Sequence, residues 1–192
     1  GRDAAVRATA GESIVFRGDP VKAFYHSSSG GHTEANHVVW GGDPIPYLKA
    51  VCDPGDFVSA NPYRTWRVET RGSEIGRQIA AATGRNVGTV KRFADVVRGE
   101  SGRIRWATVV GSGGRVRVSG WSLRGALGLR ESKVWINDDR TPTGAIRRRY
   151  DDLRCAPGLP RSDAVVIPGG HRQGFERGAL YHRNDTGRVF WL

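Results

Sequence analysis

The residues best suited to chemistry lie in one short stretch, residues 23–34, which reads AFYHSSSGGHTE. It combines three consecutive serines, two imidazoles and a carboxylate with two adjacent glycines. Glycines let the backbone approach a ligand closely, and hydroxyl and imidazole groups bond to polar ligands. Tyr25, and Trp40 further on, offer aromatic faces that can stack against sugar rings. A plainer alternative is a strand end with a capped turn, in which Ser29 or Thr33 begins a helix.

Two other chemistries fit this stretch less well. A Ser/His nucleophile is disfavoured because adjacent residues rarely reach each other in the needed geometry and no G-x-S-x-G turn is present. Zinc ligation by His26, His32, His37 and Cys52 lacks both the H-E-x-x-H spacing and a paired C-x-x-C. We therefore predict no metal site and no cofactor.

Composition limits the class of partner without fixing it. The chain of 192 residues has a net charge of +11, which suits anionic partners such as nucleic acid, teichoic acid, anionic lipid or acidic muropeptides. Arginine supplies 26 of the 30 basic residues, a skew that GC-rich coding would also produce. No nucleic-acid-binding motif accompanies the charge, and no apolar run is long enough to span a membrane, so we predict neither nucleic acid as a partner nor a transmembrane segment. Cys52 and Cys155 fit either a disulfide in an exported protein or two buried free thiols.

Periodicity and the 27 glycines favour an α+β protein dominated by strands. Residues 13–17 and 21–26 predict a β-hairpin about a turn at residues 18–20. A helix beginning at Ser73 carries Ile75, Ile79 and Ala82 on one face and ends at Gly84. A second short helix is predicted over residues 121–129. The further predicted strands are residues 47–51, 65–70, 104–110, 116–119 and 133–136, with residues 87–98 passing from irregular structure into a strand.

The composition changes near Asn137, which suggests two domains. We assign residues 1–136 to the main domain, residues 137–149 to a turn-rich linker and residues 150–192 to a small C-terminal unit. Such a short unit is marginally stable alone and usually packs against a neighbour. Its expected core residues are Leu153, Val165, Val166, Ile167, Phe175, Leu180, Tyr181, Val189, Phe190 and Trp191.

The serine-rich stretch, with V-W-G-G at residues 39–42 and P-Y-L at residues 46–48, resembles the centre of the SpoIID/LytB family. Residues 5–11 (AVRATAG) and 120–129 (GWSLRGALGL) fit the same family, so the resemblance runs from about Ala4 to Ile136. In the C-terminal unit, residues 158–181 resemble an LGFP repeat, a module of exported proteins thought to attach them to the cell wall.

The resemblance implies an exported protein, in the cell wall or outside the cell, that acts on peptidoglycan glycan strands. SpoIID-type members are lytic transglycosylases, in which one glutamic acid protonates the leaving oxygen between N-acetylmuramic acid and N-acetylglucosamine. The family's E-M-P-like segment that carries this acid has no counterpart here, so we expect the catalytic Glu upstream of Gly1, and we interpret Glu34 as a positioning group. LytB-type relatives are instead non-catalytic enhancers of a cell-wall amidase, which is the alternative reading. The predicted substrate-binding residues are Tyr25, His26, Ser27, Ser28, Ser29, His32 and Trp40.

Overall fold

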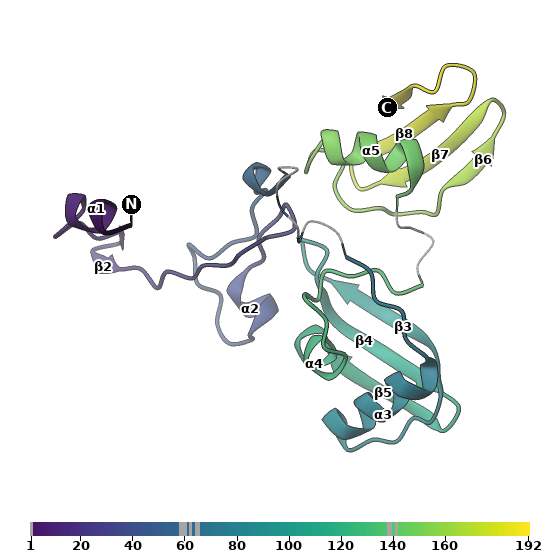
Figure 1. The fold of residues 1–192 in the computed structure, drawn as a ribbon, viewed down its shortest axis with the longest axis horizontal. Helices are drawn as coiled ribbons and strands as arrows, with labels where there is room; N and C mark the ends of the chain where they lie inside the picture. The colour runs from purple at the N-terminus through teal and green to yellow at the C-terminus, as the bar shows by residue number, and fades with distance from the viewer. Residues whose placement is uncertain (1, 58–60, 62, 64–65, 138–139, 141) are drawn as a thin grey trace.

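The computed structural model describes residues 2–57, 61, 63, 66–137, 140 and 142–192. It confirms a strand-rich α+β fold, with short helices beside three separate antiparallel sheets. Figure 1 shows an N-terminal segment that extends away from two packed units, one built on a three-stranded sheet and one on a four-stranded sheet. No helix in the described part of the chain is both long and apolar enough to cross a membrane.

The N-terminal segment has little regular structure. It contains α1 (Arg2–Ala8), which buries no residue, and the strands β1 (Val15–Phe16) and β2 (Asp19–Pro20). The predicted hairpin exists but is shorter, and its turn is one residue early, because Arg17 and Gly18 both adopt positive φ, 54° and 93°, as a two-residue type I′ turn requires. The predicted strand over residues 21–26 is wrong, since these residues are mostly exposed and pair with no third strand.

Loops and two short helices follow, α2 (Asn36–Val39) and the 3₁₀-helix η1 (Pro54–Phe57). The predicted strand over residues 47–51 is also wrong. Its backbone bonds to loop residues instead of to a strand: Thr33 Oγ1 donates to Lys49 O at 3.1 Å, Thr33 N donates to Val51 O at 2.9 Å, and Asn36 N donates to Leu48 O at 3.2 Å. The hydrogen bonds of Thr33 hold the segment that contains the serines, residues 26–34, against residues 49–51.

The central unit, residues 66–137, contains the main core. Strands β3 (Val90–Arg98), β4 (Ile104–Gly111) and β5 (Gly114–Ser119) form an antiparallel meander, and α3 (Gly72–Thr83) and α4 (Gly120–Ala126) pack on one face. The buried core residues are Ile79, Val87, Ile104, Ala107, Val109, Val118 and Leu123. Both predicted helices are confirmed to within a few residues, and Gly84 ends α3 in the left-handed conformation at φ 69°.

Two predicted strands of this unit are absent. Residues 66–70 and 133–136 have no strand partner, and Thr65 lies outside the described residues. In the second segment the Val134 carbonyl accepts a hydrogen bond from the Arg98 guanidinium at 2.9 Å, so a side chain takes the place of a neighbouring strand. Val134 and Ile136 still pack against the core.

The tail unit, residues 142–192, contains α5 (Gly144–Asp152) and a sheet of β6 (Val165–Ile167), β7 (Gly170–Phe175), β8 (Gly178–Arg183) and β9 (Val189–Trp191). Residues 144–149, assigned to a linker from the sequence, form most of α5, which lies beside this sheet (Figure 1). Ile146, Phe175 and Leu180 are the buried core, with Tyr150, Leu153 and Val189 around them. Val165, Val166, Phe190 and Trp191, also expected in the core, are exposed instead, and all four belong to the edge strands β6 and β9.

Candidate functional site

A cleft of about 650 Å³ lies where the serine-rich loop, the central unit and the tail unit meet. We call residues 26–34 the serine-rich loop. It forms one side, the β3–β4 turn and residues 130–135 form a second, and α5 with the turns around β7 forms a third. The cleft is therefore built from parts of the chain that are far apart in sequence.

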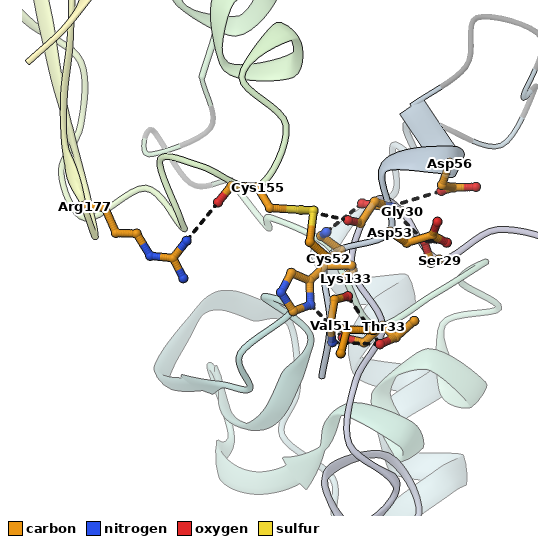
Figure 2. Close-up of a disulfide and its surroundings, with 12 residues drawn as sticks. Ser29, Gly30, Thr33, Val51, Cys52, Asp53, Asp56, Lys133, Cys155 and Arg177 are labelled. Carbon is orange, nitrogen blue, oxygen red and sulfur yellow. Dashed lines mark hydrogen bonds between the residues drawn. A yellow bond between two sulfur atoms is a disulfide. The ribbon is translucent and has the colours of Figure 1, made fainter. Parts of the chain in front are cut away.

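Two aspartates fold the serine-rich loop. Ser28 Oγ donates to Asp56 Oδ2 at 2.9 Å. Ser29 Oγ donates to Asp53 Oδ2 at 2.8 Å, and Figure 2 shows these two residues side by side. The backbone N–H of Gly31 donates to Asp56 Oδ2 at 3.1 Å. Gly30 and Gly31 both adopt positive φ, 65° and 85°, which a side chain would strain. Two of the three serines and both glycines therefore stabilise the conformation of the loop.

Two cations hold the loop carbonyls from the opposite side. Arg103, which is 7% exposed, donates to Ser29 O at 2.9 Å and to His32 O at 2.8 Å, and its guanidinium also pairs with Glu131 at 3.4 Å. Lys133 Nζ donates to Gly30 O at 2.7 Å (Figure 2). These contacts fix the loop to the central unit.

Glu34 braces the other end of the loop. Its Oε2 accepts hydrogen bonds from Ser101 Oγ at 2.6 Å and from Ser101 N at 3.2 Å, and its Oε1 accepts from Ala35 N at 3.1 Å. A Cβ at Gly99 would lie 2.1 Å from Glu34 Oε2, so a larger residue there would displace this carboxylate. These bonds agree with a positioning role for Glu34.

A disulfide between Cys52 and Cys155, with a Cα–Cα distance of 5.9 Å, joins the serine-rich region to the tail unit (Figure 2). Of the two states left open by the sequence, the structure contains the disulfide. Cys155 Sγ lies 3.1 Å from Gly31 O, and His32 pairs with Cys52 in an isolated β-bridge. Because the Cys52 sulfur is bonded, it is no zinc ligand here, and the described residues contain no cluster of three or more metal-binding side chains.

The structure separates the seven predicted substrate-binding residues into two groups. His26, Ser27, Ser28 and His32 line the cleft. Three others do not line it: Tyr25 is 98% exposed, Ser29 is 1% exposed, and Trp40 packs on Phe24 with ring centroids 4.8 Å apart.

Several residues that line the cleft or hold its serine-rich loop could not be identified from the sequence. Aromatic rings line it at Tyr63, Trp66, Trp135 and Tyr150, far from the serine-rich loop in sequence. Asp53 and Asp56 follow the predicted strand at residues 47–51, where only a turn signal was visible. Arg103 precedes one predicted strand and Lys133 begins another, and neither position carried a sequence signal for a functional role. Only their contacts in the folded chain identify them.

The cleft holds charges of both signs. Its cations are Arg124, Arg130, Lys133, Arg147, Arg154 and Arg177, and its acids are Asp56, Glu100, Glu131, Asp151 and Glu176. Among these described acids, Glu100 is the one whose carboxylate has neither a hydrogen bond nor an ion pair, and it is exposed.

Burial shifts two titratable groups that line the cleft. Burial, with the nearby charge of Arg103, lowers the pKa of Lys133 to about 8. Burial also raises the pKa of the Tyr150 phenol to about 12, against the opposing charge of Arg147. The Tyr150 ring stacks on Phe175 at 5.1 Å, so this side of the cleft is an aromatic wall continuous with the core of the tail unit.

The fold and the cleft define a strand-rich α+β protein with a polar and aromatic cleft shared by two units. The chain is similar to stage II sporulation protein D of Bacillus amyloliquefaciens, at 29% identity over 142 residues. The match covers 72% of this chain and 38% of that protein, so the chain corresponds to well under half of its relative. No family model matches the chain, and no solved structure matches it.

Proposed function

We propose that the cleft binds peptidoglycan glycan strands. The observation that carries this proposal is the composition of its walls: hydroxyl and imidazole groups of the serine-rich loop share the cleft with four aromatic rings. A pyranose ring offers hydroxyls at its edge and C–H groups on its faces, so a sugar polymer suits such walls. The similarity to a sporulation protein and the SpoIID/LytB-like residues support the same substrate.

Within this proposal the contacts to substrate come from His26, Ser27, Ser28 and His32. Ser27 is exposed, whereas the Ser28 hydroxyl donates to Asp56 and accepts from Asn61 Nδ2 at 3.0 Å, so Ser27 is the hydroxyl better placed to bond to a sugar. We leave Tyr25, Ser29 and Trp40 out of the contact set, because none of them lines the cleft.

A matched pair of tyrosine variants tests the cleft. Tyr63 lines the cleft and is 47% exposed, whereas Tyr25 is 98% exposed and lies outside it, so neither substitution should disturb folding. We expect Tyr63→Ala to weaken binding to soluble glycan-strand oligomers five- to tenfold, about 1 kcal/mol of stacking, and Tyr25→Ala to leave it unchanged. Titration calorimetry measures both. If Tyr25→Ala weakened glycan binding and Tyr63→Ala did not, the binding site would lie at the exposed residues chosen from the sequence, and the cleft would be excluded.

We further propose that these 192 residues form part of a longer protein, a lytic transglycosylase whose general acid lies outside them. Support comes from the family resemblance, in which the acid stands in a segment that this sequence does not contain. The experiment incubates purified glycan strands with this chain and, separately, with the longer protein. Mass spectrometry should find anhydromuramic ends only with the longer protein. Anhydromuramic ends made by this chain alone would contradict this placement and make Glu100 the first carboxylate to replace.

A second candidate is a non-catalytic enhancer of a cell-wall amidase. It is favoured by the contacts of the cleft acids, since Asp56, Glu131 and Glu176 are all engaged in hydrogen bonds or ion pairs within the chain. An amidase assay on purified peptidoglycan, with and without the longer protein, tests it. Faster peptide release without any anhydromuramic ends would support the enhancer, and anhydromuramic ends would exclude it.

We also propose that the protein works outside the cytoplasm and that its tail unit helps retain it in the cell wall. Disulfides persist in oxidising compartments, which supports export. The LGFP-like residues support retention. Fractionation of cells that produce the longer protein is expected to recover it with the wall, and recovery in the cytosol would contradict the proposal.

A further inference from the structure

The face of the central sheet opposite its helices carries an unusual set of side chains. Ala107, Val109 and Val118 point to the core beneath α3 and α4, so the alternate residues point outward. Strand pairing places Arg92, Val110 and Arg115 in one row across the sheet, and Ala94, Thr108 and Arg117 in the next. We call these residues, with Trp106, the outer sheet face.

This face is open and strongly basic. Arg92, Arg115 and Arg117 are exposed, and Trp106 is 41% exposed. The three strands contain six basic residues and one acid, Asp95, which stands at an irregularity in the pairing of β3. Within the described chain, the guanidinium groups of Arg92 and Arg115 take part in no hydrogen bond or ion pair. Burial and ion pairing therefore do not account for these two charges.

The spacing of the arginines suits a linear anion. Arg92 and Arg115 flank one strand, which puts their Cα atoms about 10 Å apart, and Arg115 and Arg117 are about 7 Å apart along β5. The Arg117 guanidinium lies over the Trp106 ring at 4.9 Å, which keeps its charge at the surface in a fixed place. Guanidinium groups bind phosphate oxygens in a fixed fork geometry, so a chain of phosphates can engage several of them in turn.

We propose that the outer sheet face binds a polyol phosphate polymer, a chain of phosphodiester-linked sugar alcohols. Single-stranded nucleic acid fits less well, because successive bases need several aromatic platforms and the outer sheet face offers the single ring of Trp106. The sheet also lacks the protruding apolar side chains that would insert into a lipid surface, apart from Val97 beside Trp106. The inference stands apart from the glycan cleft, since none of these residues lines it.

The test compares the double variant Arg92→Gln/Arg115→Gln with Arg7→Gln/Arg85→Gln, which removes the same charge from exposed positions elsewhere. The ligand is a fluorescent poly(glycerol phosphate), followed by anisotropy from 50 to 200 mM NaCl, values chosen to bracket about 0.1 M where screening changes steeply. Removing two phosphate contacts should weaken binding about tenfold and reduce the slope of log affinity against log salt by about 1.4. The control variant should bind within twofold of the unaltered chain.

Three outcomes would overturn the proposal. They are no binding by the unaltered chain, an equal loss in both double variants, and equal or tighter binding of single-stranded oligothymidylate or of anionic phosphatidylglycerol vesicles with the same dependence on Arg92 and Arg115. Titration with glycan-strand oligomers, run on the same variants, keeps the two sites separate, because the cleft residues are intact in both.

Discussion

Lys133 should make the stability of this protein rise between neutral and mildly alkaline pH. Its pKa falls from 10.5 in the unfolded chain to about 8 in the folded protein, mainly through burial and then through the charge of Arg103. A lowered lysine pKa means that the folded state binds fewer protons than the unfolded state between these values. The free energy of unfolding therefore increases as pH rises through about 8 and levels off above 10.5.

The size of the effect follows from the same shift. One pKa unit corresponds to about 1.4 kcal/mol, so the full span from pH 7 to pH 9.5 would yield about 2 kcal/mol. The Lys133 side chain is only partly buried, so solvent screens part of this, and we expect about 1–2 kcal/mol. At pH 9.5 the raised pKa of Tyr150 lowers the free energy of unfolding by only about 0.2 kcal/mol, because that phenol begins to ionise in the unfolded state while it stays protonated in the folded state.

Urea unfolding at pH 7.0 and 9.5, with the disulfide intact, measures the gain. The variant Lys133→Met has a side chain of similar length without the amine, so it should lose this gain while other titrations remain. The difference between the two gains isolates Lys133. Equal gains in the unaltered chain and the variant would show that the amine is solvated and that the contact with Gly30 O does not bury it.

The other predictions concern the frame of the cleft. Arg103→Met removes the donor to two loop carbonyls, and the unbonded carbonyls should cost about 2–4 kcal/mol in urea unfolding. Gly31→Ala strains a residue at φ 85° and should cost about 1–2 kcal/mol, whereas Gly125→Ala, in open space on α4, should be neutral or slightly stabilising. Replacing Cys52 and Cys155 by serine removes a link across 103 residues and should cost about 2–5 kcal/mol, with faster amide hydrogen exchange where the tail unit borders the cleft. Unchanged values for any of these would contradict the role given to that residue.

The parts of the fold that could be predicted from sequence are those with local causes. The α3 helix follows from apolar residues on one face and from Gly84, and the β4–β5 hairpin follows from alternation on both sides of a glycine-rich turn. Residues 47–51 and 133–136 have strand-like composition, but a strand also needs a neighbouring strand to pair with, and neither segment has one. Thr33 and Asn36 bond to the backbone of the first segment and Arg98 bonds to that of the second, and no alternation within the segments reveals these partners.

The candidate site likewise has one part that the sequence predicts and another that depends on the fold. The serine-rich loop was identified from its own residues, and four of its predicted contact residues do line the cleft. The opposite walls come from α5 and from residues 100–135, which share no sequence signal with the loop. The pairing of Cys52 with Cys155 also depended on the fold, because the sequence allowed free thiols equally well.

The geometry of the loop suggests a reason for its distinctive composition. Ser29 and Gly31 are buried. Ser28 donates to Asp56 and Ser29 donates to Asp53, both of which lie further along the chain, after α2. Gly30 and Gly31 have positive φ, which turns the carbonyls of Ser29, Gly30 and His32 toward Arg103 and Lys133 of the central unit. A motif of this kind specifies a loop conformation first and a ligand second. Ser27 is the exception, an exposed hydroxyl at the cleft, and so substitution there should affect glycan binding without affecting stability.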